Sequence, residues 1–395
     1  MNVLVLNCGS SSVKFQLIDP ILAEPLGKGL VERIGAKDAI VSYRSGGKNA
    51  IREVREIPDH DAAIRRALSD LLHPDYGAIK DQSEIDAVGH RVVHGGEAFQ
   101  DSVQITEYVV ETIRSCSKFA PLHNPHNLRG IQVSMELLPG VPQVAVFDTA
   151  FHQTMPPEAY TYALPLEVYK KLGIRRYGFH GTSHRYVVGA AAERLGRPPS
   201  ELRLITCHLG NGASITAVKG GVSVETSMGF TPLEGLVMGT RCGDIDPYIV
   251  LYLLENDGMT IQAVDALLNK KSGLLGLSGV SNDMRELLGE AELGNANARL
   301  AVDVFCHRAR KYVGAYAAVM GGADAVVFTG GIGENSVPIR ERICQGLGFL
   351  GIEVSPELNS QHAPNISTGR TPVLVIHTNE ELAIAQDTRR LLCGS

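Results

Sequence analysis

The sequence lacks any run of about 18 apolar residues, the length that a membrane-spanning helix requires. The N-terminal segment MNVLVLNCG has no basic stretch before its short apolar run, so we predict no signal peptide and a cytoplasmic location. An excess of positive charge is also missing, because 37 basic residues stand against 43 acidic ones, a net charge of −6. A protein with this charge balance has no net positive potential to attract nucleic acid or an anionic membrane, so we expect neither as a partner.

Paired cysteines and a zinc-protease motif are absent too. The odd number of cysteines and the lack of a C-x-x-C pair indicate reduced thiols and argue against structural zinc. The pairs His90/His94 and His180/His184 have HxxxH spacing, but no HExxH occurs, so we assign these histidines no metal role. The cysteines are Cys8, Cys116, Cys207, Cys242, Cys306, Cys344 and Cys393.

Glycine is abundant, with 42 residues, and three segments place it directly after an apolar, β-branched run. These are VLVLNCGSSSVKFQLID at 3–19, LRLITCHLGNGASITAVK at 202–219 and AVVFTGGIGENS at 325–336. After the first two turns a second strand-like run begins, where a P-loop would need a helix. Small residues let backbone N–H groups approach a polyphosphate closely, so the pattern predicts phosphate-binding turns. Lys14, just beyond the first turn, is a cation well placed for a phosphate.

The remaining pattern is α/β with mixed sheets. At 395 residues and 44% hydrophobic composition, the chain favours two domains. Helices are predicted in 59–73, 106–119, 126–138, 244–258 and 297–322, and strands in 85–96 and 142–148, the latter ending at Asp148. The two glycine hairpins suggest a duplicated unit, although such hairpins can also arise independently.

Two helix starts carry capping signals. Asp246 and Pro247 predict an N-cap and first turn for a helix that ends at Gly258. Near the C-terminus, Thr378 and Glu381 predict a capping box at the start of the last helix. Glu380 is not used by that box, and its carboxylate could hold a hydrated Mg²⁺.

Ten segments, in order along nearly the whole chain, resemble the acetate kinase (acetokinase) family. They include NCGSSSVK at 7–14, GHRVVHGG at 89–96, RRYGFHGTSH at 175–184, GGIGEN at 330–335 and TNEEL at 378–382. The others are PLHNP at 121–125, VFDTAFH at 146–152, HLGNGAS at 208–214, EGLVMGTRCGDIDP at 234–247 and SNDMREL at 281–287.

This resemblance implies the fold of the acetate and sugar kinase, Hsp70 and actin superfamily. Two ribonuclease H-like lobes with mixed sheets, flanked by helices, would enclose a nucleotide cleft. Residues 1–148 with a returning helix at 382–395 would form the N-terminal lobe. Residues 149–381 would form the C-terminal lobe, which binds nucleotide and joins a homodimer.

The implied reaction is reversible, in-line transfer of the γ-phosphoryl group of ATP to acetate, giving ADP and acetyl phosphate. By resemblance, Arg91, Asp148, His180 and Arg241 would surround the transferring group, and Asn7 and Glu380 would hold Mg²⁺ or Mn²⁺. The acid would meet Arg91, Val93, Leu122, His123, Phe179 and Pro232. Nucleotide contacts would come from Ser10, Ser12, Lys14, His208, Leu209, Gly210, Asn211, Gly212, Asp283, Met284, Arg285, Gly331, Ile332, Gly333, Glu334 and Asn335.

The chemistry suits these residue types. A carboxylate substrate with a pKa near 4 is already an anionic nucleophile, so it needs no general base. Asp148 would then orient Arg91 or a metal-bound water. The harder task is to bring two anions together and stabilise the charge on the equatorial oxygens, for which paired arginines and a histidine donor are suited.

Some positions and the substrate stay open. Cys242 stands where the family pattern favours serine, and it is either a small packing residue or a redox-active thiol. Arg285 could stack on adenine or cap its own loop. Propionate kinases share nearly all these motifs, and one methylene changes binding by only about 1–3 kcal/mol. A nucleotide-driven module such as the Hsp70 ATPase lobe is the alternative from another class. A sugar kinase is the third alternative, but this sequence shows no set of polar residues for a sugar pocket.

Overall fold

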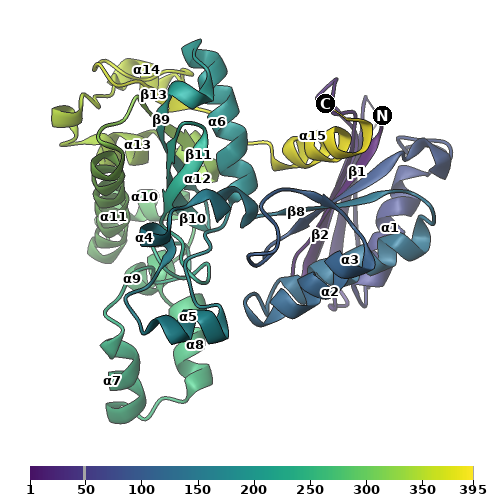
Figure 1. The fold of residues 1–395 in the computed structure, drawn as a ribbon, viewed down its shortest axis with the longest axis horizontal. Coiled ribbons are helices and arrows are strands. Elements are labelled where there is room, and N and C mark those ends of the chain that lie inside the picture. The colour runs from purple at the N-terminus through teal and green to yellow at the C-terminus, as the bar shows by residue number, and fades with distance from the viewer. Residues whose placement is uncertain (48–49, 395) are drawn as a thin grey trace. The chain divides into compact units, whose positions relative to one another are not determined.

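The computed structural model describes residues 1–47 and 50–394. Within these residues the chain divides into two compact units. The first unit comprises Met1–Gln153 with Asn379–Ser395, and the second comprises Thr154–Thr378. The boundaries expected after residues 148 and 381 lie a few residues from these divisions. Figure 1 shows a sheet covered by helices in each unit.

The first unit is built on a mixed sheet with the strand order β5-β4-β3-β2-β1-β6-β8-β7. Its strands are β1 Val3–Cys8, β2 Ser12–Ile18, β3 Pro25–Glu32, β4 Ala39–Ser45, β5 Ile51–Arg55, β6 Ala87–Val92, β7 Val103–Gln104 and β8 Gln143–Phe147. Its helices are α1 His60–Leu71, α2 Glu107–Ser115, α3 Asn124–Leu137 and α15 Glu380–Cys393.

Helices cover both faces of this sheet (Figure 1). Gly89 of β6 faces α15, where a Cβ would lie 2.6 Å from Ile384. The next residue, His90, turns to the opposite face and contacts Ser134 of α3. Because successive side chains of a strand alternate between faces, α15 and α3 lie on opposite sides of β6. Strand β6 therefore reads as an almost continuous buried segment.

The second unit has a sheet with the order β11-β10-β9-β12-β13. Its strands are β9 Arg203–Leu209, β10 Ala213–Lys219, β11 Val222–Thr226, β12 Ala325–Thr329 and β13 Val373–Val375. Its helices are α4 Pro157–Tyr160, α5 Leu166–Leu172, α6 Gly181–Leu195, α7 Tyr248–Asn256, α8 Ile261–Lys270, α9 Gly273–Ser278, α10 Met284–Glu292, α11 Ala296–Met320, α12 Gly330–Asn335, α13 Val337–Cys344 and α14 Pro356–Ser360.

The two sheets share a core arrangement. In the first unit, β3, β2 and β1 pair antiparallel, and β1, β6 and β8 pair parallel. In the second unit, β11, β10 and β9 pair antiparallel, and β9, β12 and β13 pair parallel. The same order, direction and sequence succession in both units favour the duplicated unit that the glycine hairpins suggested.

The first two glycine turns are hairpins, as predicted, joining β1 to β2 and β9 to β10. The third turn differs from them, because β12 runs directly into α12 through Gly330, which has a φ of +75°. All three turns follow the carboxyl end of a strand in the parallel part of a sheet. That edge is where ligands bind in open α/β sheets.

Both predicted helix caps need correction. The N-cap of α7 is Pro247, although the carboxylate of Asp246 still accepts the N–H of Tyr248 at 2.9 Å. The N-cap of α15 is Asn379, whose side chain accepts the N–H of Leu382, so the predicted Thr378–Glu381 capping box is wrong. No helix within residues 1–47 and 50–394 combines the length and apolar character needed to span a bilayer.

Candidate active site

In the first unit, a tight turn joins β1 to β2 and brings polar groups to one face. The N–H of Gly9 donates to the carbonyl of Ser12 at 2.8 Å and closes the turn. Asn7 and Lys14 lie opposite each other in the antiparallel register, so their side chains share a face of the sheet. Lys14 Nζ lies 2.5 Å from the carboxylate of Glu381, in the first turn of α15. The start of α15 therefore lies beside the Asn7–Lys14 pair.

Arg91 and Asp148 form a two-point ion pair at the ends of β6 and β8. Arg91 donates from Nε to Asp148 Oδ1 at 3.0 Å and from a terminal nitrogen to Oδ2 at 2.7 Å. Glu380 approaches the same guanidinium at 3.7 Å. Burial raises the pKa of Asp148, while the charge of Arg91 opposes that shift. Of the two roles expected for Asp148, orienting Arg91 is the one that this geometry displays.

The residues expected to hold a divalent cation have suitable donor atoms. Asn7 offers an amide oxygen and Glu380 a carboxylate, the hard oxygen ligands that Mg²⁺ prefers. Asn379 caps α15, so neither glutamate is needed as the cap. The carboxylate of Glu380 instead lies 3.7 Å from Nε of Arg91. Within the described residues no cluster of three or more His, Cys, Asp or Glu side chains forms a metal cage. A cation that keeps its waters and takes phosphate oxygens fits such a sparse site.

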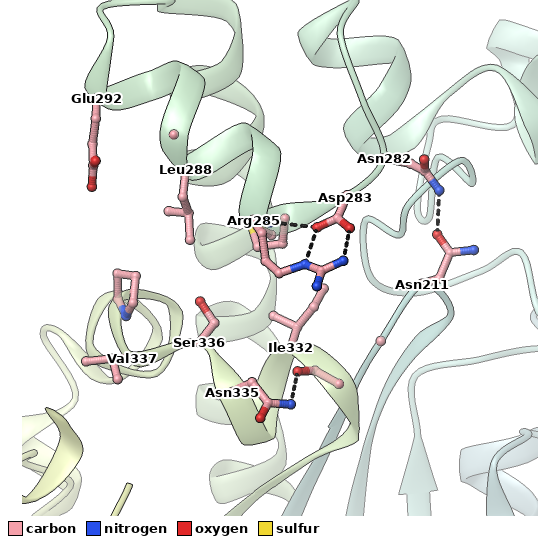
Figure 2. A pocket seen from close by; sticks show the side chains of 15 residues that line it. Asn211, Asn282, Asp283, Arg285, Leu288, Glu292, Ile332, Asn335, Ser336 and Val337 are labelled. Atoms are coloured by element: carbon pink, nitrogen blue, oxygen red, sulfur yellow. Dashed lines mark hydrogen bonds and ion pairs between the residues drawn. The ribbon is translucent and has the colours of Figure 1, made fainter. Parts of the chain in front are cut away.

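In the second unit, a pocket of about 860 Å³ lies among the second glycine turn, the start of α10 and the segment from α12 to α13 (Figure 2). It unites three segments that lie far apart in the sequence, those around residues 210, 284 and 332. Its lining residues are Gly210, Asn211, Asn282, Asp283, Met284, Arg285, Leu288, Gly289, Glu292, Gly331, Ile332, Asn335, Ser336, Val337 and Pro338. The volume lies within the range of sites that take drug-sized ligands and cofactors.

The glycine turn of residues 210–212 lies between this pocket and a pair of cationic or donor side chains. Asn211 lines the pocket, and its side chain accepts from Asn282 at 3.0 Å. On Gly212, a Cβ would lie 3.4 Å from His180 Nε2 and 3.6 Å from Arg241 Nη1. His180 and Arg241 thus meet at the same turn, within one unit.

His180 is held by its backbone and by its ring. Its φ of 58° places it in the left-handed region directly before α6. Nδ1 hydrogen-bonds with the hydroxyl of Ser214 at 2.9 Å, and the ring stacks on His208 with centroids 4.3 Å apart. A left-handed residue other than glycine is costly and is retained where surrounding contacts fix it. These contacts direct Nε2 toward Gly212.

Arg241 is partly buried, and no carboxylate of the described residues neutralises it. Its Nη1 donates to the carbonyl of Pro232 at 3.3 Å and lies 3.8 Å from the sulfur of Met238. Within the described residues no carboxylate pairs with this guanidinium, and burial lowers its pKa. A buried charge normally has a partner, so an unpaired arginine beside a glycine turn indicates a site for an anion.

The model of the acetokinase family matches residues 2–386 of this chain. The chain belongs to the acetokinase family. It is 56% identical to the acetate kinase of Alkaliphilus metalliredigens (strain QYMF), over 99% of this chain and 100% of that protein. The crystal structure of Porphyromonas gingivalis acetate kinase matches it with a TM-score of 0.94 at 47% identity, over 99% of each chain.

A propionate kinase is nearly as similar. Its crystal structure, from Francisella tularensis subsp. tularensis SCHU S4, matches with a TM-score of 0.93 at 46% identity, over 99% of this chain and 100% of that chain. The predicted fold class, an α/β protein with two mixed sheets flanked by helices, is confirmed by these family structures and by the strand order.

Several residues that the acetokinase resemblance assigned to the nucleotide are not among the residues that line this pocket. Glu334 does not line the pocket; its carboxylate accepts from the N–H groups of Gly330 and Thr378 and pairs with His377. His208, Leu209, Gly212 and Gly333 are also outside the lining set, while Ser10, Ser12 and Lys14 belong to the first unit. Arg285 lines the pocket but is 90% exposed and pairs with Asp283, which lowers the pKa of that carboxyl to about 2.

The acid-binding residues of the family pattern have different environments. Val93 and Phe179 are buried, whereas Leu122 is 52% exposed. His123 is the residue before α3. Burial raises the pKa of the Cys242 thiol and so disfavours the thiolate that redox chemistry would need, which favours a packing role. His90 and His184 have protein partners: His90 contacts Gln143, and His184 contacts Thr206 and Ser214.

Part of this pocket, and one residue that supports it, do not follow from the sequence patterns. Ser336 has a shielded hydroxyl that finds no partner in the described part of the chain. It directly follows the GGIGEN motif, which is the signal that could have found it. Arg340 is fully buried and donates to the carbonyls of Gly333 and Glu334 at the end of α12. The other missed lining residues are Asn282, Leu288, Gly289, Glu292, Val337 and Pro338.

Proposed function

We propose that this chain is an acetate kinase, which transfers the γ-phosphoryl group of ATP to acetate and forms acetyl phosphate and ADP, reversibly. The observation that carries the proposal is the partly buried Arg241, which has no carboxylate partner among the described residues and meets His180 at a glycine turn beside the pocket of about 860 Å³. Membership of the acetokinase family supports the same reaction.

In the proposed reaction, an oxygen of the acetate carboxylate attacks the γ-phosphorus in line. The new C–O–P linkage forms as the bond to the β,γ-bridging oxygen breaks, and ADP leaves with that electron pair. Because the nucleophile is already ionised at neutral pH, no side chain has to remove a proton. The protein's task is to hold two anions and to stabilise the charge of the transferring group.

We assign Arg91 and Asp148 of the first unit, and His180 and Arg241 of the second, to the transferring group. Arg91 would grip an anion while Asp148 fixes its orientation through two hydrogen bonds. Asn7 and Glu380 would hold Mg²⁺ or Mn²⁺, which would supply charge neutralisation to the phosphate oxygens. The acetate methyl would meet Val93, Leu122, Phe179 and Pro232, with His123 nearby.

We assign the nucleotide to the second-unit pocket. The residues common to the family pattern and the lining are Gly210, Asn211, Asp283, Met284, Arg285, Gly331, Ile332 and Asn335. Figure 2 displays Ile332 and the Asp283–Arg285 pair on the same side of the pocket. We add Ser336, whose buried hydroxyl is a suitable partner for a polar group of the nucleotide.

Propionate phosphorylation is a second candidate, favoured by the likeness to the Francisella tularensis propionate kinase. The test is a hydroxamate assay of acyl phosphate with acetate, propionate and butyrate, with and without Mg²⁺. A higher kcat/KM for acetate supports the proposal, and a higher kcat/KM for propionate replaces the substrate. Failure to form acyl phosphate from any of the three acids contradicts the acyl kinase reaction.

A homodimer joined through the second unit is the proposed assembly. Helix α7 buries no residue in this chain, although its sequence is YIVLYLLEN. Tyr248, Ile249, Leu251 and Tyr252 are exposed there. A contiguous exposed apolar face marks an interaction site, and a second copy of the chain is the occupant that the family resemblance favours.

A further inference from the structure

The loop of residues 229–234 connects the two residues that meet at the second glycine turn. At its start, the carbonyl of Gly229 accepts from the N–H groups of Tyr177 and Gly178 at 3.1 and 3.2 Å, just before Phe179 and His180. At its apex, the carbonyl of Pro232 accepts from Arg241. The position of this loop therefore bears on both His180 and Arg241.

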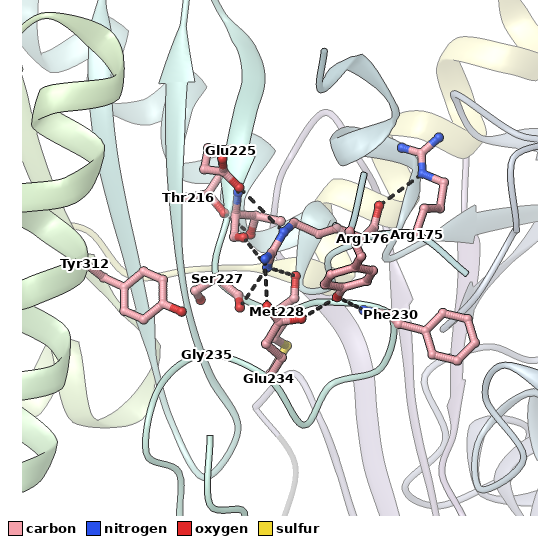
Figure 3. A network of polar contacts seen from close by, with 12 residues as sticks. Arg175, Arg176, Thr216, Glu225, Ser227, Met228, Phe230, Glu234, Gly235 and Tyr312 are labelled. Carbon is pink, nitrogen blue, oxygen red and sulfur yellow. Dashed lines mark hydrogen bonds and ion pairs between the residues drawn. The ribbon is translucent and has the colours of Figure 1, made fainter. Parts of the chain in front are cut away.

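Two partly buried side chains, those of Tyr162 and Arg176, hold the loop, and Figure 3 shows the network around Arg176 and Glu234. The hydroxyl of Tyr162 accepts the N–H of Phe230 at 2.8 Å and donates to the carboxylate of Glu234, so it joins the two legs of the loop. Arg176 donates to the other oxygen of Glu234 at 2.7 Å. Burial raises the pKa of Tyr162, which keeps the hydroxyl protonated and able to donate.

Arg176 also fixes the chain that leads into the loop. Its Nη1 donates to the carbonyls of Thr226, Ser227 and Met228, at 3.0 to 3.3 Å. A guanidinium that meets several carbonyls and a carboxylate has little freedom, because its donors have a fixed geometry. Arg176 thus holds the chain that enters the loop, and Tyr162 links Phe230 to Glu234 across its base.

The packing around this contact leaves no room for a side chain at residue 229. A Cβ on Gly229 would lie 1.7 Å from Glu234 Oε2 and 2.2 Å from the Tyr162 hydroxyl. Because residue 229 has no side chain, Phe230 and Glu234 can both reach the hydroxyl of Tyr162. The apex residue Pro232 is consequently held at a set distance from the network.

We propose that Tyr162, Arg176 and Glu234 form a loop clamp, a set of positioning residues that fixes Pro232 and Arg241 and thereby sets the size of carboxylic acid accepted. This inference rests on the proposed function, because Pro232 is assigned there to the acid's methyl group. The clamp acts through the loop and touches neither the nucleotide pocket nor the reacting atoms. Its loss should therefore affect the acid more than ATP.

The test is Tyr162→Phe, which removes the hydroxyl and keeps the ring. We expect KM for acetate to rise roughly tenfold, because the N–H of Phe230 and the carboxylate of Glu234 each lose a buried partner. We also expect the ratio of kcat/KM for acetate to that for propionate to fall several-fold, because one methylene is discriminated only by a firmly placed wall. KM for ATP should stay unchanged.

The matched control is Tyr312→Phe. Tyr312 is also partly buried, and its hydroxyl donates to Asp244 at 2.8 Å in the neighbouring part of the network, not to a residue of the 229–234 loop. We expect a similar shift in Tm and an unchanged KM for acetate. A rise in KM for acetate as large as that of Tyr162→Phe would mean that general loosening is responsible, and would overturn the clamp.

Hydrogen exchange of the peptide containing Phe230 separates the clamp from the reaction. Faster exchange in Tyr162→Phe than in the wild type and Tyr312→Phe supports the clamp, and equal exchange in all three overturns it. If the wild-type protein forms acyl phosphate while Tyr162→Phe keeps the same KM and acid preference, the inference on specificity fails. If the wild-type protein forms none, the proposed function fails instead, and exchange alone decides whether the clamp exists.

Discussion

Arg241 is held by neutral groups, a carbonyl and a thioether, that fix its position and leave its charge uncompensated. We predict that Arg241→Lys lowers kcat about a hundredfold, because an ammonium group cannot reproduce the two parallel hydrogen bonds of a guanidinium. KM for ATP should change little, since Arg241 is not among the lining residues of the pocket. Steady-state kinetics with both substrates varied is the measurement, and near-wild-type kcat would remove Arg241 from the transferring group.

Glu380 and Glu381 are adjacent but have different partners. We predict that Glu380→Gln raises the Mg²⁺ concentration for half-maximal rate about tenfold, because a neutral amide is a weaker ligand for a hard cation. Glu381→Gln is the matched control: its carboxylate pairs with Lys14, so the Mg²⁺ requirement should stay near that of the wild type. Titration of activity with Mg²⁺ at fixed ATP distinguishes them, and equal shifts in both variants would contradict the assignment.

Residues on glycine turns could be located from the sequence, because only small residues allow the close approach that phosphate binding requires. Gly210 and Gly331 do line one pocket. Leu288 and Glu292 could not be found this way, since their positions on helix α10 and long-range packing bring them to the pocket. The ion pair of Arg91 with Asp148 joins the ends of two parallel strands, and its only signal in the sequence is that both residues follow apolar runs.

At the scale of elements, α12 is a short helix that depends on one buried arginine. We predict that Arg340→Met lowers the free energy of unfolding by about 3 kcal/mol, because the carbonyls of Gly333 and Glu334 lose their charged donor. KM for ATP should rise as well, because α12 supplies Gly331 and Ile332 to the pocket. Arg342→Met is the control: this half-exposed residue pairs with Asp303, and its loss should cost less than about 1 kcal/mol. Urea unfolding of both variants checks the difference.

Helix interiors followed from apolar periodicity, but helix starts did not always follow from capping signals. Thr378 has the right chemistry for an N-cap, yet its N–H donates to Glu334 and its hydroxyl contacts Ser183. These partners are distant in the sequence, so the cap moves to Asn379. Local propensity yields here to tertiary contacts that a single sequence does not reveal.

At the scale of the whole molecule, buried histidines connect stability to pH. Burial lowers the pKa of His90 to about 4, from an ordinary value of 6.5. Below pH 6.5 the unfolded chain binds a proton that the folded chain does not, so stability falls by about 1.4 kcal/mol per pH unit until the pH nears 4. We predict that His90→Gln loses stability less steeply over this range. Urea midpoints between pH 7 and 4 test this, and equal slopes would show that His90 does not contribute.

The apolar face of α7 makes a prediction about assembly. Helix α7 is apolar but has no buried residue in its own chain, so removing its apolar surface from water would stabilise an assembly. In a homodimer, the exposed side chains of Leu251 and Tyr252 would be buried. We expect the wild-type protein to sediment as a dimer, and the double variant Leu251→Ser with Tyr252→Ser to sediment as a monomer at micromolar concentration. Tyr108→Ser, which changes an exposed tyrosine of α2 in the first unit, should leave the sedimentation coefficient unchanged. A wild-type monomer would exclude the homodimer. A double variant that stays dimeric would place the dimer interface on a surface other than α7.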